Sequence, residues 1–102
     1  MLDASALSES DLITQLICTA KYYPLIRKMS LFGSRSRGSF HYTSDFDVCV
    51  YCEDEKEFTR FYFDVDDIDT FYKIDVLRYE DITNDILKRE IEKGIVLYES
   101  EG

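Results

Sequence analysis

Two aspartates separated by one residue stand in a segment that has the pattern of a strand. Asp45 and Asp47 flank Phe46, and apolar and other residues alternate over residues 45–51. Alternate residues of a strand share a face, so the spacing predicts that both carboxylates lie on one face, about 7 Å apart along the chain. Such a pair suits Mg²⁺, which binds a few carboxylates and completes its shell with water and phosphate oxygens.

A third aspartate has a similar setting further along the chain. Asp75 lies within residues 71–78, which also have a strand pattern, although aspartate is normally disfavoured in strands. If this strand lies beside the first one with Asp75 on the same face, its carboxylate is a third metal ligand. Three acids on one sheet face without matching basic residues would otherwise be a poor structural choice.

A glycine and a serine precede the aspartate pair and are candidates for binding phosphate. Gly33 and Ser34 follow a short predicted strand over residues 26–32. If residues 36–38 form a helical turn, its free N–H groups and the Ser34 hydroxyl could donate to a phosphate, and Gly33 would allow close approach because it has no Cβ. Taken alone, a glycine-serine turn most often only reverses the chain.

Charge links the two halves of this segment. A carboxylate and a phosphate oxygen about 4 Å apart repel by roughly 4 kcal/mol at an effective dielectric constant of 20. Divalent cations would therefore have to bridge the acids and a triphosphate, as in two-metal phosphoryl and nucleotidyl transfer. Arg37 lies in the same segment and could bind phosphate oxygens or form a surface salt bridge.

The remaining sequence predicts the elements that position these residues. Apolar spacing and turn residues give an alternation of helices and strands. The expected elements are a helix from a capping box at residues 8–11 to Pro24, strands over 26–32 and 45–51, a helix around 58–65, a strand over 71–78, a helix over 82–93 and a strand over 95–98. This order predicts an α/β (α+β) fold, a small mixed sheet with helices covering one face and the other face left for chemistry.

Composition narrows the class of protein. The chain has 102 residues, of which 45% are hydrophobic, and we expect one folded domain over residues 1–102. The formal net charge of −9 argues against direct binding of nucleic acid, which requires Lys and Arg to neutralise phosphates. No apolar run reaches the roughly 20 residues that span a bilayer, and no signal peptide is evident, so we expect a cytoplasmic protein without a membrane partner.

The spacing of the candidate residues resembles a known signature. Gly33-Ser34, then ten residues, then Asp45-Phe46-Asp47, with a third strand aspartate at Asp75, is similar to the motif of the polymerase-beta-type nucleotidyltransferases. The resemblance covers about residues 12–99. It implies the nucleotidyltransferase fold for this chain.

A narrower resemblance is to the minimal nucleotidyltransferases. The short chain, the Arg37-Gly38 pair and the segment over residues 92–99 are similar to these proteins, which form the antitoxin half of two-gene modules whose other half is a HEPN-domain ribonuclease. Ser36 departs from the pattern, since relatives often have alanine there. The resemblance implies transfer of AMP from ATP to a tyrosine hydroxyl of a HEPN toxin partner, and hence a hetero-oligomer.

The same resemblance implies a role for each candidate residue. Asp45 and Asp47 would hold two Mg²⁺ ions, and Asp75 would bind the catalytic metal and help to deprotonate the attacking hydroxyl. Gly33 and Ser34 would bind the β- and γ-phosphates of ATP. Arg37 is expected at the same nucleotide site.

Two other functions stay open on the sequence. The protein could be a binding antitoxin that acts by occlusion without catalysis. It could also transfer a nucleotide to a small molecule with the help of a separate substrate-binding subunit. A rival acidic segment over residues 64–69 lacks the glycine and glutamate of an EF-hand loop, and we interpret it as a solvated connection.

Overall fold

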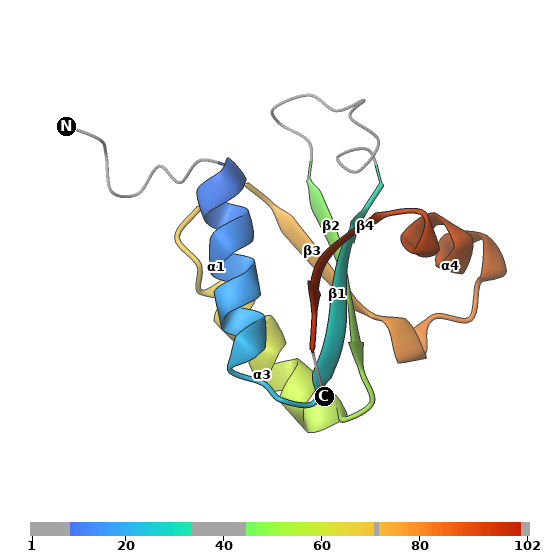
Figure 1. The fold of residues 1–102 in the computed structure, drawn as a ribbon, viewed down its shortest axis with the longest axis horizontal. Helices are drawn as coiled ribbons and strands as arrows, with labels where there is room; N and C mark the ends of the chain where they lie inside the picture. The colour runs from blue at the N-terminus through green and yellow to red at the C-terminus, as the bar shows by residue number, and fades with distance from the viewer. Residues whose placement is uncertain (1–8, 34–44, 71, 101–102) are drawn as a thin grey trace.

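The computed structural model describes residues 9–33, 45–70 and 72–100 (Figure 1). Helices and strands alternate in the predicted order. The elements are α1 (Glu9–Lys21), β1 (Ile26–Phe32), β2 (Phe46–Cys52), α3 (Glu55–Asp66), β3 (Ile74–Arg78), the 3-10 turn η1 (Tyr79–Asp81), α4 (Asp85–Glu92) and β4 (Ile95–Glu99). The strand predictions over 26–32, 45–51 and 95–98 are therefore correct to within a residue.

The four strands form one mixed sheet in the order β3-β2-β1-β4. Strand β1 is antiparallel to both β2 and β4, whereas β2 and β3 are parallel. As Figure 1 shows, the end of β1 and the starts of β2 and β3 lie at the same end of the sheet. This end carries the candidate carboxylates.

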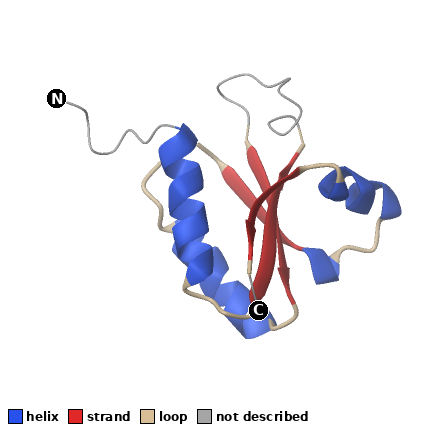
Figure 2. Ribbon diagram, in the orientation of Figure 1, coloured by secondary structure: helices blue, strands red, loops and turns tan. Residues whose placement is uncertain are grey.

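Helices α1 and α3 cover one face of the sheet and enclose the main core (Figure 2). The buried side chains include Leu12 and Leu16 from α1, Phe61 from α3, and Phe46 and Val48 from β2. The spacing of apolar residues in both helices predicted these faces. The fold class predicted from the sequence is confirmed.

The expectation that helices cover only one face is wrong in one respect. Helix α4 packs on the opposite face, where Ile91 forms a second apolar cluster with Phe32 and Cys49. The cause is that β1 and β2 carry apolar side chains on both faces, and the second set also requires cover from water. Part of the face expected to be free for chemistry is therefore occupied by α4.

Side-chain caps set where two helices begin. The Asp54 carboxylate accepts from the backbone N–H groups of the first turn of α3, and the Asn84 side chain accepts from Leu87 N at 3.1 Å. Helix α4 thus begins at Asp85, after the turn η1, and the prediction that it begins at residue 82 is wrong. The predicted capping box of the first helix includes Ser8, which lies outside the described residues.

A buried arginine fixes the far end of the sheet. Arg78 at the end of β3 is 8% exposed, and its guanidinium donates to the Asp81 carboxylate at 2.8 Å and to the carbonyl oxygen of Cys52 at 3.0 Å. Glu55 accepts a further bond at 3.2 Å. These bonds tie β3 to the turn between β2 and α3 and supply the partners that a buried cation requires.

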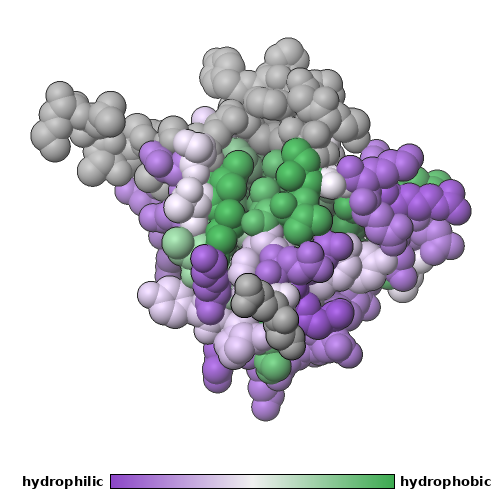
Figure 3. Space-filling view, viewed as in Figure 1, coloured by the Kyte–Doolittle hydropathy of each residue, from purple (hydrophilic) through white to green (hydrophobic). Residues whose placement is uncertain are grey.

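Strand β4 forms an edge of the sheet and leaves apolar side chains in contact with water. Ile95 and Val96 are 49% and 48% exposed. On the face shown in Figure 3, apolar side chains gather over α1 and β4. Gly94, just before the strand, passes so close to β1 that an added Cβ would collide with the carbonyl oxygen of Leu31.

The three cysteines are free thiols, and strand β2 sends Cys49 and Cys52 to different faces of the sheet. Cys52 belongs to the core under α1 and α3, and Cys49 belongs to the cluster under α4. Burial raises the pKa of Cys49 to about 12. In the part of the chain that the structure describes, no helix is long and apolar enough to cross a membrane.

Candidate active site

The register of the sheet brings two of the predicted aspartates directly together. In the parallel pair of β2 and β3, Asp47 lies opposite Asp75, and in the antiparallel pair of β1 and β2 it lies opposite Phe32. Neighbouring strands are about 4.8 Å apart. The two carboxylates therefore lie side by side, and both residues are half-buried.

Asp45 stands immediately before β2, two residues from Asp47. Its carboxylate is more exposed, at 41%, and its Oδ2 atom is 4.0 Å from the Nζ atom of Lys73. Asp45 thus lies at the same end of the sheet as Asp47 and Asp75, next to Lys73, whose charge can neutralise it.

Gly33 meets the carboxylate pair from the neighbouring strand. It follows β1 with a φ of +76°, in the left-handed region that favours glycine. A Cβ added at this position would lie 2.5 Å from the Oδ2 atom of Asp47. The glycine is therefore required twice, once for its backbone conformation and once because the aspartate carboxylate lies against it.

Among the described residues, the neighbours that act on the charge of Asp47 are the two other carboxylates. The pKa of Asp47 is raised above its usual value, first because burial disfavours the charged form, and then because Asp75 and Asp45 repel it. A cation beside Asp47 would remove this repulsion. The donor set, carboxylates with room for water and phosphate oxygens, fits the preference of Mg²⁺.

The support for a metal comes from a pair of carboxylates. Among residues 9–33, 45–70 and 72–100, no group of three or more His, Cys, Asp or Glu side chains is arranged as a ready metal cluster. The feature that supports a metal is the register pair of Asp47 and Asp75, whose negative charges repel each other. Such a pair suits an ion that also binds a nucleotide, since Mg²⁺ takes part of its shell from phosphates.

Two predicted nucleotide ligands cannot be placed. Ser34 and Arg37 lie outside the described residues, as does the helical turn predicted over residues 36–38. Their roles stay predictions. Gly33 is the described residue that joins this segment to the carboxylates.

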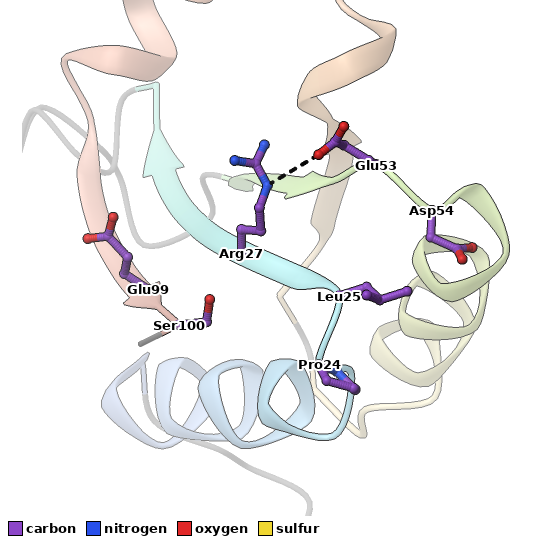
Figure 4. Close-up of a pocket in the computed structure, with 7 residues that line it drawn as sticks. All are labelled: Pro24, Leu25, Arg27, Glu53, Asp54, Glu99 and Ser100. Carbon is purple, nitrogen blue, oxygen red and sulfur yellow. Dashed lines mark ion pairs between the residues drawn. The ribbon is translucent and has the colours of Figure 1, made fainter. Parts of the chain in front are cut away.

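A further cavity in the described residues is remote from the carboxylates. It has a volume of about 600 Å³ and lies at the other end of β1 (Figure 4). Arg27 on its wall pairs with Glu53 at 4.0 Å and with Glu80 at 3.4 Å. None of the predicted site residues lines this cavity, and its arginine already pairs with acids of the protein, so its lining gives no reason to place the site there.

A smaller cavity lies between α3 and the start of β3, on the face of the sheet opposite the one to which strand alternation assigns the carboxylate pair. It has a volume of about 300 Å³ and is lined by Asp75 together with Tyr62 of α3 and Tyr72. The sequence pattern placed Tyr62 on the apolar stripe of its helix, but this side chain is 44% exposed. Sequence reasoning missed the cavity, and the position of Tyr62 at the border of the stripe was the one available signal.

Comparison with known proteins identifies the family. The family model for "Polymerase beta, Nucleotidyltransferase" matches residues 14–102, which include Gly33 and all three aspartates. This chain belongs to the polymerase beta nucleotidyltransferase family. In this nucleotidyltransferase, three α-helices and a four-stranded mixed sheet in the described residues form the fold of the family.

Solved structures similar to this nucleotidyltransferase come from toxin–antitoxin complexes. A mutant MntA complex is 17% identical with a TM-score of 0.61, covering 87% of this chain and 74% of that one. A toxin–antitoxin complex with AMP-PNP is 20% identical with a TM-score of 0.59, covering 92% and 76%. A tri-AMPylated HEPN toxin in complex with an MNT antitoxin, from Shewanella oneidensis, is 16% identical with a TM-score of 0.58, covering 92% and 75%.

These structural matches establish the fold. A search of the curated proteins gave no match to this sequence. The activity of the nucleotidyltransferase must therefore be argued from its own residues.

Proposed function

We propose that this nucleotidyltransferase is an antitoxin that transfers AMP from ATP to a tyrosine hydroxyl of a HEPN ribonuclease, and thereby silences it. The observation that carries the proposal is the register pair of Asp47 and Asp75 against the backbone of Gly33. Two similar structures support the choice of nucleotide and acceptor, since one contains AMP-PNP and the other a tri-AMPylated HEPN toxin.

Each candidate residue has a role in this proposal. Asp45, Asp47 and Asp75 hold two Mg²⁺ ions, and Gly33 with Ser34 binds the β- and γ-phosphates. When bound, the two Mg²⁺ ions neutralise phosphate charge and polarise the α-phosphoryl group. Because Asp47 and its neighbours repel an unscreened triphosphate, the protein binds ATP as its magnesium complex.

The transfer exchanges a phosphoanhydride bond of ATP for a phosphoester bond to the tyrosine. The tyrosine oxygen attacks the α-phosphorus and forms a new O–P bond, while the bond from that phosphorus to the oxygen shared with the β-phosphate breaks. Pyrophosphate leaves with the electron pair. Asp75 helps to remove the phenolic proton. Arg37 binds phosphate oxygens and stabilises the negative charge of the leaving pyrophosphate.

The partner follows from the same proposal. The 102-residue chain acts as one domain, and it works in a hetero-oligomer with its toxin. Its net charge of −9 suits a partner with a basic surface, such as a protein that binds RNA.

A labelling experiment tests the proposal. The purified protein is mixed with a HEPN protein encoded by a neighbouring gene, Mg²⁺ and ATP labelled at the α-phosphate. We expect label on a tyrosine of the partner, no label from ATP carrying the isotope at the γ-phosphate, and loss of labelling in Asp47→Asn. Label that persists in the double variant Asp45→Asn/Asp47→Asn would show that these residues are not catalytic.

Occlusion without catalysis is a second candidate, favoured by the exposed apolar side chains of Ile95 and Val96. The double aspartate variant separates the two functions. If it still protects cells from the toxin while transferring no AMP, occlusion is sufficient. Transfer to a small molecule would instead require a separate substrate-binding subunit.

A further inference from the structure

A lysine lies among the carboxylates of the candidate site. Lys73 directly precedes β3, and its carbonyl oxygen accepts a hydrogen bond of 2.9 Å from the backbone N–H of Phe46, the first residue of β2. The ladder between the two parallel strands therefore continues to the residues just before them. These residues are Asp45 on the side of β2 and Lys73 on the side of β3.

Strand alternation assigns the four charged side chains of this region to one face of the sheet. Asp45 is two residues from Asp47, and each therefore shares a face with the other. The same spacing relates Lys73 to Asp75. Across the strands, Asp47 lies opposite Asp75, and the Nζ atom of Lys73 is 4.0 Å from the Oδ2 atom of Asp45.

The two cross-strand pairs differ in charge. Asp47 and Asp75 carry charges of the same sign, whereas Lys73 and Asp45 attract each other. Among the described residues, Lys73 is thus a cation that already pairs with a candidate metal ligand. Its side chain is 71% exposed, so its flexible stem can move the ammonium group without disturbing the core.

Lys73 and a metal ion would compete for the carboxylate of Asp45. Mg²⁺ binds carboxylate oxygens directly, and the lysine ammonium is a compact charge that is attracted to the same oxygens. Both cations on one carboxylate would repel each other. A bound triphosphate changes this balance, because its oxygens offer the displaced ammonium a new charge-assisted hydrogen bond.

We propose that Lys73 makes the binding of metal at this site depend on the nucleotide. In the empty site its ammonium stays on Asp45 and opposes Mg²⁺ alone, and when magnesium ATP binds, the ammonium moves to a phosphate oxygen. The inference rests on the proposed function and adds to it a residue that binds the nucleotide. The protein therefore takes up its metal together with ATP and holds little Mg²⁺ without it.

Two binding measurements test the inference without any transfer. Mg²⁺ alone is titrated into the ¹⁵N-labelled protein, and its Kd is measured from the signals of residues 45–49 and 73–77. In the second titration, Mg²⁺ is saturating and the ligand is α,β-methylene-ATP, whose α-phosphoryl group cannot be transferred. We expect Lys73→Met to tighten the binding of Mg²⁺ alone by about tenfold and to weaken the binding of the nucleotide by about tenfold.

The opposite signs of these two changes distinguish the proposed role from a structural one. A lysine that only supports the local fold would change both affinities in the same direction, or neither of them. Either result would overturn the inference. Lys73→Arg keeps the positive charge, and it should retain the weak binding of Mg²⁺ alone.

An exposed lysine outside the site supplies a matched control. Lys56 is in the first turn of α3, after the end of β2, whereas the site lies at the start of that strand. Lys56→Met removes the same charge from the chain and should leave both affinities unchanged. If it reproduced the effects of Lys73→Met, net charge would explain them and the inference would fail.

The outcomes also separate this inference from the proposed function. If the unchanged protein transfers AMP and Lys73→Met binds Mg²⁺ and the nucleotide as Lys56→Met does, the inference fails while the function stands. If Lys73→Met changes the two affinities in opposite directions but no AMP is transferred to the HEPN partner, the proposed function fails and the role of Lys73 stands.

Discussion

Replacing Asp47 with asparagine should stabilise the protein while it removes activity. The carboxylates of Asp47 and Asp75 lie on directly opposed positions of adjacent strands. At a separation of about 5 Å, two such charges repel by roughly 3 kcal/mol at an effective dielectric constant of 20. Partial exposure to water and salt reduce this to about 1 kcal/mol, the gain in free energy of unfolding expected for Asp47→Asn at pH 7.

The dependence on pH follows from the direction of the pKa shift. The pKa of Asp47 is raised in the folded state above its ordinary value of 3.8. Between these two values the folded state binds more protons than the unfolded state, so the stability of the unchanged protein falls as pH rises through that interval. The advantage of Asp47→Asn should therefore be present at pH 7 and disappear below about pH 3, where both forms are neutral.

Thermal unfolding without metal measures this effect. A gain of about 1 kcal/mol should raise the Tm by roughly 4–8 °C in a domain of this size. Asp66→Asn is the matched control, because Asp66 is exposed and its substitution also removes one negative charge from the chain. Adding Mg²⁺ should raise the Tm of the unchanged protein more than that of Asp47→Asn. An unchanged or lower Tm for Asp47→Asn at pH 7, with Asp66→Asn as reference, would refute the reasoning.

Three further predictions concern single features. Gly33→Ala should lower stability by about 1–2 kcal/mol in urea and reduce AMP transfer, because its φ is +76° and the new Cβ would collide with Asp47. Full stability of this variant would show that the turn can relax. Arg78→Met should cost about 2–3 kcal/mol in urea, since several charge-assisted bonds are lost, and a loss within error of zero would contradict that role. Iodoacetamide at pH 8 should modify Cys18 in the folded protein and spare Cys49, whose pKa is raised to about 12, until the protein unfolds. Mass spectrometry measures the modification of each cysteine, and equal modification of both in the folded state would contradict the prediction.

Local patterns in the sequence were enough to predict three of the four strands to within a residue, whereas the strand predicted over 71–78 begins at Ile74. Alternation fixes which residues of a strand lie on one face, so the positions of Asp45 and Asp47 could be predicted without tertiary information. The pairing of Asp47 with Asp75 could be stated only as a condition. It depends on the strand order and parallel register, which the crossover through α3 makes possible by connecting β2 to β3 across one face of the sheet.

The parts that sequence reasoning missed depend on which surfaces meet. The apolar face of α4 predicts that the helix is buried on one side, but it does not say which face of the sheet the helix covers. The 3-10 turn at Tyr79–Asp81 carries the chain to the opposite face from α1 and α3. Likewise, the 44% exposure of Tyr62 depends on how far α3 lies from its neighbours, which the pattern of its helix does not specify.

The central claim is that Asp47 and Asp75 form a catalytic metal–nucleotide site that modifies a partner protein. The most direct measurement is the intact mass of the HEPN partner after incubation with this protein, Mg²⁺ and ATP. We expect the mass of the partner to increase by one or more AMP units on tyrosine. Chelation of the metal, Asp47→Asn and Asp75→Asn should each abolish this increase. An unchanged mass with the unaltered protein, or a gain that survives both substitutions, would contradict it.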